Sequence, residues 1–310
     1  MLKVGTILRG IYRIDSYLSS GGFGNTYVAT NIEFEERVAI KEFYMKGITQ
    51  RDDRYNSVTV SNMENQACFL QQREKFKKEA RRLRKLKNEH IVKVHDLFEE
   101  NGTAYYVMDY IDGESLSERM KRTGKALTET EVTSILKQVL EALREVHQNE
   151  IWHLDLKPGN IMLDKSGTAY LIDFGASKQI RPNGSVTTST ALCYTPGYAP
   201  NEQIGQMYDR FGAWTDLYAL GATAYNLLTN KKPPMAIDIE EDEEDAFDFP
   251  NTLSDTTKQL IIWMTQPKRK KRPQSVDEVL EKLDHQPTTQ KMPLQTPEED
   301  IEETIVISSA

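Results

Sequence analysis

The sequence contains little cysteine and no long apolar segment, and these two features exclude several classes of protein. Cysteine occurs only at positions 68 and 193, too few for the disulfide framework of a small secreted domain or for a four-cysteine zinc cluster. No apolar run approaches the roughly 20 residues that a membrane-spanning helix needs. Residues 1–10 also lack the apolar core of a secretory signal peptide. We therefore expect a protein of the reducing cytoplasm with no membrane segment.

An excess of positive charge is also missing. Lys and Arg total 39 against 47 Asp and Glu, which gives a net charge of −8 and argues against binding nucleic acid through bulk positive charge. The charges are nevertheless segregated, with nine basic residues in 73–87, eight acidic residues in 238–248 and a second basic cluster at 268–272. Each run is typical of a solvated face. We expect no nucleic-acid partner, because no aromatic residues interleave the first run.

Hydrophobic residues make up 38% of the 310 positions, enough for one large two-lobed core. Residues 12–18 alternate between apolar and polar types, and β-rich runs follow at 25–30, 37–43, 91–99 and 104–110. One helix interrupts them over about 71–87, because Phe76, Ala80, Leu83 and Leu86 recur at helical spacing.

After Gly113 the pattern becomes helical. Thr128 and Glu131 form a capping box that predicts the start of a helix, and further helices are predicted over 216–228, 255–264 and 275–283. The sequence therefore predicts an α+β protein with a β-rich N-lobe over 1–110 and a mainly helical C-lobe over 111–285. The acidic tail over 286–310 is expected to be disordered. The polar stretch 45–70 receives no assignment.

Two features of the first lobe are compatible with phosphate binding. Residues 19–26 are rich in glycine and lie between two strands, where backbone amides can approach a polyphosphate, although a simple hairpin turn has the same composition. Lys41, on the strand 37–43, is either a surface lysine or a cation that needs a phosphate or carboxylate. Glu79 could supply that carboxylate. It shares the apolar face of the predicted helix, where an unpaired charge is costly, but it could also pair with its basic neighbours.

The most informative cluster lies in the second lobe. Asp155, Lys157 and Asn160 fall within six residues, and Asp173 follows at the end of a predicted strand. Asn160 and Asp173 offer the oxygen ligands that Mg²⁺ prefers. Asp155 can accept a hydroxyl proton, and Lys157 can offset developing phosphoryl charge.

These elements, in this order, resemble the motif set of the eukaryotic-like serine/threonine protein kinases, and most of all the bacterial branch of that family. The resemblance covers about residues 10–285. It implies a two-lobed protein-kinase-like fold and transfer of the γ-phosphoryl group of ATP to Ser/Thr hydroxyls of protein substrates, with autophosphorylation. The implied cofactors are ATP and Mg²⁺, or Mn²⁺ in its place.

The resemblance also implies roles for individual residues. Lys41 is expected to hold the α/β-phosphates and to pair with Glu79, while Asp155 acts as the catalytic base. Met108 is the implied gatekeeper, and residues 109–111 form the hinge that meets adenine. The other implied ATP-binding residues are Leu18, Gly21, Gly22, Phe23, Gly24, Ala39, Asp109, Tyr110, Ile111 and Met162.

Four more residues have implied structural roles. Glu202 ends the activation segment 173–202 and is expected to pair with a buried Arg272. Asp216 is expected to brace the backbone of the catalytic loop. Lys157 together with Thr195 indicates Ser/Thr rather than Tyr substrates.

The sequence departs from the family pattern at several positions. Ser19 replaces the first glycine of the loop, and Thr26 replaces the usual valine over adenine. Glu79 follows Lys41 by 38 residues, further than is common, so residues 45–70 are interpreted as an insertion. Leu154 replaces the arginine that reads a phosphothreonine in many kinases. We therefore expect activity to depend weakly on the candidate phosphorylation sites of the activation segment, which are Thr187, Thr188, Ser189 and Thr190.

Two other functions remain open from the sequence: a pseudokinase scaffold that binds partners without turnover, and a small-molecule kinase. The five polar residues Lys41, Glu79, Asp155, Asn160 and Asp173 argue against the first, and the complete activation segment argues against the second. In the tail, Thr304 follows five acidic residues and precedes Ile307 by three. It is a candidate phosphorylation site that a phosphothreonine-binding module of the forkhead-associated type would read, the alternative being a solubilising tail.

Overall fold

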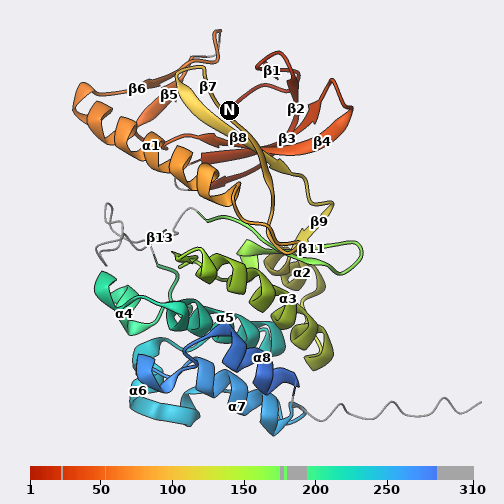
Figure 1. The fold of residues 1–310 in the computed structure, drawn as a ribbon, viewed down its shortest axis with the longest axis vertical. Coiled ribbons are helices and arrows are strands. Elements are labelled where there is room, and N and C mark those ends of the chain that lie inside the picture. Colours follow the sequence, from red (N-terminus) through yellow and green to blue (C-terminus); the bar gives the residue numbers. More distant parts are fainter. Residues whose placement is uncertain (22–23, 53, 175–177, 180–193, 285–310) are drawn as a thin grey trace, which may run out of the picture.

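The computed structural model describes residues 1–310 except 22–23, 53, 175–177, 180–193 and 285–310. Its first lobe is built on a six-stranded antiparallel sheet in the order β1-β2-β3-β4-β8-β7 (Figure 1). The strands are β1 (Ile7–Leu8), β2 (Tyr12–Gly21), β3 (Gly24–Asn31), β4 (Glu36–Phe43), β7 (Val94–Glu100) and β8 (Thr103–Asp109). The predicted β-rich lobe is confirmed.

Strand alternation decides which residues of the sheet face the rest of the molecule. On β4 and β8, Ala39 pairs in register with Met108, and Lys41 pairs with Tyr106. Their neighbours Val38 and Val107 point to the opposite face and belong to a separate apolar core. Because successive side chains of a strand point to opposite faces, Lys41 lies on the face that packs against α1.

Helix α1 (Gln66–Leu83) covers this face of the sheet (Figure 1). The prediction of residues 71–87 was wrong at both ends. Phe69 packs on Phe43, with ring centroids 5.3 Å apart, so the apolar side of the helix begins before Phe76. Leu86 is buried but follows the end of the helix at Leu83. The helical spacing of apolar residues therefore continues past the helix, which explains why the predicted end was too late.

The unassigned stretch 45–70 contains a β-hairpin, formed by β5 (Thr49–Arg51) and β6 (Val58–Val60), followed by the 3₁₀ turn η1 (Met63–Asn65). The Arg51 guanidinium forms an ion pair with Glu42 on β4, and the two side chains are 3% and 0% exposed. Asn25 Nδ2 and Tyr27 Oη also donate to Glu42 Oε2, at 3.0 and 3.1 Å. The hairpin is therefore joined to the interior of the first lobe.

The second lobe is mainly helical, as predicted (Figure 1). Its helices are α2 (Leu116–Thr123), α3 (Glu129–Gln148), α4 (Asn201–Ile204), α5 (Ala213–Thr229), α6 (Ala236–Asp242), α7 (Asp255–Met264) and α8 (Val276–Asp284). The predicted capping box starts α3: Thr128 Oγ1 accepts from the Glu131 amide, and the Glu131 carboxylate accepts from the Thr128 amide. In the central helix α5, 13 residues including Asp216 are buried, so this helix lies in the interior of the second lobe, beneath the backbone of residues 153 and 154.

Short strands form the surface of the second lobe that faces the first. β11 (Ile161–Asp164) lies between β12 (Ala169–Leu171) and β9 (Gly113–Ser115), and β10 (Ile151–Trp152) pairs with β13 (Lys178–Gln179). β11 and β12 form a hairpin whose turn includes Ser166 and Gly167. No helix of the described residues is long and apolar enough to cross a membrane.

Candidate active site

Lys41 lies at the centre of a charge cluster between the lobes. Its Nζ is 2.8 Å from Asp173 Oδ1 and 3.6 Å from Glu79 Oε1. Burial disfavours the charged ammonium, but the nearby Asp173, Tyr106 and Glu79 outweigh burial and raise the pKa of Lys41 well above 10.5. Burial raises the pKa of Glu79, an effect that Lys41 opposes. The sequence placed Glu79 on the inner face of its helix, and the structure brings it to Lys41.

Asp155 is the centre of a second cluster, on the surface of the helical lobe. Lys157 Nζ lies 3.0 and 2.8 Å from the two carboxylate oxygens. Asn160 Nδ2 donates to Asp155 Oδ2 at 2.9 Å, and Thr195 Oγ1 donates to Oδ1 at 3.1 Å. Lys157 and Asn160, which lie within five residues of Asp155 in the sequence, and Thr195 from a distant segment therefore converge on the Asp155 carboxylate.

Asp216 fixes the backbone that carries Asp155. Its buried carboxylate accepts from the amides of His153 and Leu154 at 2.9 and 2.8 Å, and it pairs with His147 Nε2 at 2.8 Å. Burial acts to raise the pKa of Asp216, but the hydrogen bond and charge of His147 prevail and lower it. Leu154 is held at φ +64°, a left-handed conformation unusual outside glycine, so these hydrogen bonds stabilise a strained turn.

Two histidines whose roles the sequence patterns do not indicate, His147 and His153, also support this turn. His153 is fully buried, and burial lowers its pKa. Its Nδ1 accepts from the Asp155 amide at 3.3 Å, and its Nε2 lies 3.2 Å from the Ile172 carbonyl oxygen. These partners select the neutral imidazole with the proton on Nε2. The only signal in the sequence was proximity to Asp155, which does not specify this role.

Asp173 and Asn160 are the residues that could hold a divalent cation. The amide nitrogen of Asn160 is engaged by the backbone and side-chain oxygens of Asp155, at 2.7 and 2.9 Å, so its amide oxygen is the atom left for a cation. The Asp173 side chain is 46% exposed beside Lys41. Phe174 packs on His153 with ring centroids 4.6 Å apart, which fixes the turn that presents Asp173 at φ +59°. Two hard oxygen ligands fit Mg²⁺, which completes its shell with water and substrate phosphates.

No group of three or more His, Cys, Asp or Glu side chains in the described ranges could hold a metal on its own.

The glycine-rich segment includes a narrow hairpin, because Gly21 pairs with Gly24 across the β2–β3 turn. A Cβ on Gly24 would lie 2.5 Å from the Glu42 carbonyl oxygen, so this glycine is required by the sheet alone. Gly22 and Phe23 lie outside the described residues. Of the other predicted nucleotide contacts, Leu18 on β2 is 48% exposed and Ala39 on β4 is 5% exposed. Met162 lies on β11.

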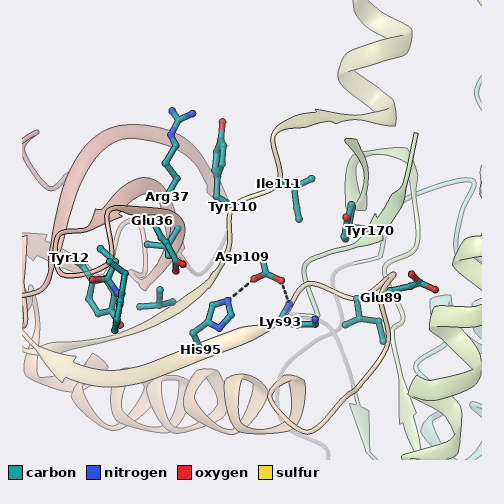
Figure 2. A pocket seen from close by; sticks show the side chains of 15 residues that line it. Tyr12, Glu36, Arg37, Glu89, Lys93, His95, Asp109, Tyr110, Ile111 and Tyr170 are labelled. Carbon is teal, nitrogen blue, oxygen red and sulfur yellow. Dashed lines mark hydrogen bonds and ion pairs between the residues drawn. The ribbon is translucent and has the colours of Figure 1, made fainter. Parts of the chain in front are cut away.

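The Asp109 side chain of the expected hinge lies on the face of the sheet opposite Lys41, because Asp109 pairs in register with Val38. Figure 2 shows Asp109 hydrogen-bonded to the Lys93 amide at 3.1 Å and paired with His95 Nε2 at 2.6 Å. The Arg37 guanidinium lies 4.7 Å from the centroid of the Tyr110 ring. These side chains line a pocket of about 810 Å³, which also includes Val38 and Val107 from the outer face of the sheet. Because the side chains of Asp109 and Tyr110 are engaged away from Lys41, the main-chain groups of the hinge are the ones available to a ligand beside Lys41.

Glu202 on α4 and Arg272, directly after the 3₁₀ turn η5 (Arg269–Lys271), are brought together as the sequence predicted, with Nη1 and Oε1 2.6 Å apart. The candidate phosphorylation sites at residues 187–190 and Thr304 lie outside the described residues.

Comparison with known proteins is consistent with this arrangement. The family model described as the protein kinase domain matches residues 12–283. Serine/threonine-protein kinase PrkC of Bacillus subtilis is 29% identical over 232 residues, which cover 75% of this chain and 32% of the relative. Serine/threonine-protein kinase PknA of Nostoc sp. is 33% identical over 239 residues, covering 73% of this chain and 38% of the relative.

PknA of Mycobacterium tuberculosis is 30% identical over 236 residues, covering 74% of this chain and 49% of the relative. The chain thus spans between about a third and a half of the length of these relatives. Among solved structures, one titled "PpkA-294 apo form" superposes with a TM-score of 0.79 at 27% identity, covering 91% of this chain and 99% of that one.

Proposed function

Because the chain belongs to the protein kinase domain family, we propose that it is an active serine/threonine protein kinase that transfers the γ-phosphoryl group of ATP to protein hydroxyls. One observation carries the proposal: the Lys41 cluster and the Asp155 cluster are both assembled, each with its polar partners in place. Such buried or half-buried charges are costly without a function. The lobes expected at 1–110 and 111–285 would be the two halves that close on the nucleotide.

Each cluster would perform one part of the reaction. Asp155 orients the acceptor hydroxyl and accepts its proton, while Lys157 compensates the charge that develops on the transferred phosphoryl group. Lys41 holds the α/β-phosphates, and Glu79 keeps its ammonium in position. A divalent cation bound by Asn160 and Asp173 would neutralise phosphate charge during transfer. Mg²⁺ is the proposed ion because both ligands are hard oxygens, and Mn²⁺ shares this preference.

Thr195 supports Ser/Thr rather than Tyr as the acceptor. Its hydroxyl lies 3.2 Å from Lys157 Nζ and 3.1 Å from Asp155 Oδ1, so the Thr195 side chain limits the space through which an acceptor hydroxyl reaches Asp155. The short side chain of Ser or Thr fits this space better than the long ring of Tyr. The pseudokinase and small-molecule alternatives have no observation in their favour. The use of ATP and the low cysteine content favour the cytoplasm as the site of action.

A phosphotransfer assay with Mg·ATP tests the proposal. Wild-type protein and Asp155→Asn would be incubated with ATP and analysed by phosphosite mapping for autophosphorylation at residues 187–190 and at Thr304. Incorporation by the wild type alone supports the function. Equal incorporation by both proteins, or none by either, would reject it. A phosphorylated Thr304 would also justify measuring binding to a forkhead-associated module, which we propose as a partner.

A further inference from the structure

A second groove, of about 460 Å³, opens directly beside Lys157. One wall comes from α2 and the turn after it, including Met120 and Lys121, and the other from the end of α5, including Asn230. Gly159 and Tyr198 complete the lining next to the Asp155 cluster. The groove thus starts at the candidate phosphoryl-transfer site and leads away from it over the helical lobe.

The walls of this groove are fixed to one another. Gly124 ends α2 at φ +65°, and Asn230 ends α5 at φ +56°. The Asn230 side-chain amide donates to the Gly124 carbonyl at 3.2 Å, and the Leu127 amide donates to the Leu227 carbonyl at 2.8 Å. Two helix ends are therefore joined by hydrogen bonds, and a ligand would enter a groove that already has its shape.

The charge of the groove is opposite to that of the chain. None of the described residues that line it is acidic, whereas Lys121 and Lys157 are both cationic. Lys157 is paired with Asp155. Lys121 is exposed and forms no ion pair with any residue that the structure describes. Although the net charge of the protein is −8, this groove therefore exposes a positive charge, on Lys121, that forms no ion pair with the described residues.

We propose that this groove selects acceptor segments in which acidic residues surround or precede the hydroxyl, and that residues 298–307 of the same chain are such a segment. This inference rests on the proposed kinase function. Before Thr304 the segment carries Glu298, Glu299, Asp300, Glu302 and Glu303. An extended chain spans about 3.3–3.6 Å per residue, so the acids two to six positions before the hydroxyl lie roughly 7–20 Å from it. With Thr304 at Asp155, they fall within reach of the groove and Lys121.

The step on this segment is an ordinary phosphoryl transfer. Thr304 Oγ1 forms the new bond to the γ-phosphorus of ATP, the bond from that phosphorus to the β–γ bridging oxygen breaks, and ADP leaves. The hydroxyl proton passes to Asp155. Charge selection in the groove acts on binding of the acceptor and not on this step, so its effect is expected in KM rather than kcat.

Two peptides and two variants test the inference. The acidic peptide has the sequence of residues 298–307, in which Thr304 is the only hydroxyl. In the neutral peptide each Glu is replaced by Gln and the Asp by Asn. Wild-type protein should phosphorylate the acidic peptide with kcat/KM about tenfold higher. Lys121→Glu should reduce this preference about tenfold, because the substitution replaces attraction between Lys121 and the acidic side chains by repulsion. Lys270→Glu makes the same charge change at an exposed site on η5, outside the groove, and should keep the preference.

The outcomes separate this inference from the proposed function. Equal kcat/KM for the two peptides, with autophosphorylation intact, would overturn the groove assignment and leave the kinase function standing. The same holds if Lys121→Glu and Lys270→Glu reduce the preference equally, because general electrostatics would then explain it. Absence of transfer to either peptide and of autophosphorylation would overturn both. A tenfold preference that only Lys121→Glu removes, through KM, would support the inference.

Discussion

Arg272 and Glu202 form a bidentate ion pair in the interior of the helical lobe, with Nη1 and Nη2 at 2.6 and 3.1 Å from the two carboxylate oxygens. The side chains are 0% and 5% exposed. Nε of Arg272 also donates to the Gln266 carbonyl at 2.5 Å, and Nη2 donates to the Pro267 carbonyl at 2.8 Å. The pair links Glu202, at the end of the segment 173–202, to the turn before α8.

Arg272→Ala should lower the free energy of unfolding by about 3–5 kcal/mol, because Glu202 would remain buried without its partner. Denaturant unfolding of the two proteins measures this difference. Lys270→Ala, at an exposed site on η5, is the matched control and should change stability little. Equal losses from both substitutions would show that the cluster 268–272 acts only as a charged surface.

Lys41→Met, Asp155→Asn and Asp173→Asn should each reduce phosphotransfer by roughly 10²–10⁴-fold while leaving the fold intact. The three side chains line the space between the lobes and do not fill a packed core. Initial rates with Mg·ATP, together with circular dichroism of each variant, check both parts. Wild-type turnover in Asp155→Asn would contradict the assignment of the base.

Activity should depend weakly on phosphorylation of the activation segment. Leu154 is 2% exposed and packs with Trp152 and Phe211, so an apolar cluster occupies the position from which an arginine would bind a phosphate. Replacing Thr187, Thr188, Ser189 and Thr190 together by Ala should therefore change kcat/KM by less than about tenfold, the size of one charge-assisted hydrogen bond. A hundredfold loss would show that another cation reads the segment.

Arg51→Met should destabilise the first lobe by about 3–5 kcal/mol, because the fully buried Glu42 would lose its cation. Arg54→Met removes an exposed arginine from the same hairpin and should have little effect. Adding Glu42→Gln to Arg51→Met should recover part of the loss, since the uncompensated charge is then gone. If the double variant loses as much as the sum of the single variants, the two residues are not coupled.

Stability should fall on acidification below about pH 6.5 because of His153. Burial lowers the pKa of this imidazole from its ordinary value of 6.5, so below that pH the unfolded chain binds a proton that the folded chain does not. The free energy of unfolding then decreases by up to about 1.4 kcal/mol for each pH unit. Denaturant unfolding at about pH 7.5 and 5.5 should show a smaller pH effect in His153→Gln than in the wild type. Identical pH effects in the two proteins would contradict the role of burial.

Local motifs were predictable from the sequence because their signals are short-range. The capping box of Thr128 and Glu131 marked the start of α3, and the polar residues around Asp155 marked the catalytic loop. The hairpin at residues 49–60 was not predictable, because its strands have only three residues each and β5 is polar. The hairpin is stabilised by a tertiary contact, the ion pair between Arg51 and Glu42 on β4.

The acidic run at 238–248 was interpreted as a solvated face, and its eight acidic residues are exposed. Its secondary structure, α6 followed by the 3₁₀ turn η4 (Glu243–Ala246), was not predicted. Only Ala236 and Ile239 of α6 are buried, too few to give an apolar period. The roles of His147 and His153 depend on partners at Asp216 and Ile172, which only the folded chain brings near.

The buried pair of Glu42 and Arg51 has a consequence for the history of this chain. Segments inserted into loops are usually easy to lose, since their ends lie at the surface and few contacts depend on them. Here, deletion of the hairpin would leave Glu42 inside the first lobe without its cation, and loss of Glu42 would leave Arg51 buried without its anion. A lineage can therefore discard the segment only when both sites change together. The hairpin is therefore entrenched, because removing the hairpin alone or Glu42 alone leaves an unpaired buried charge.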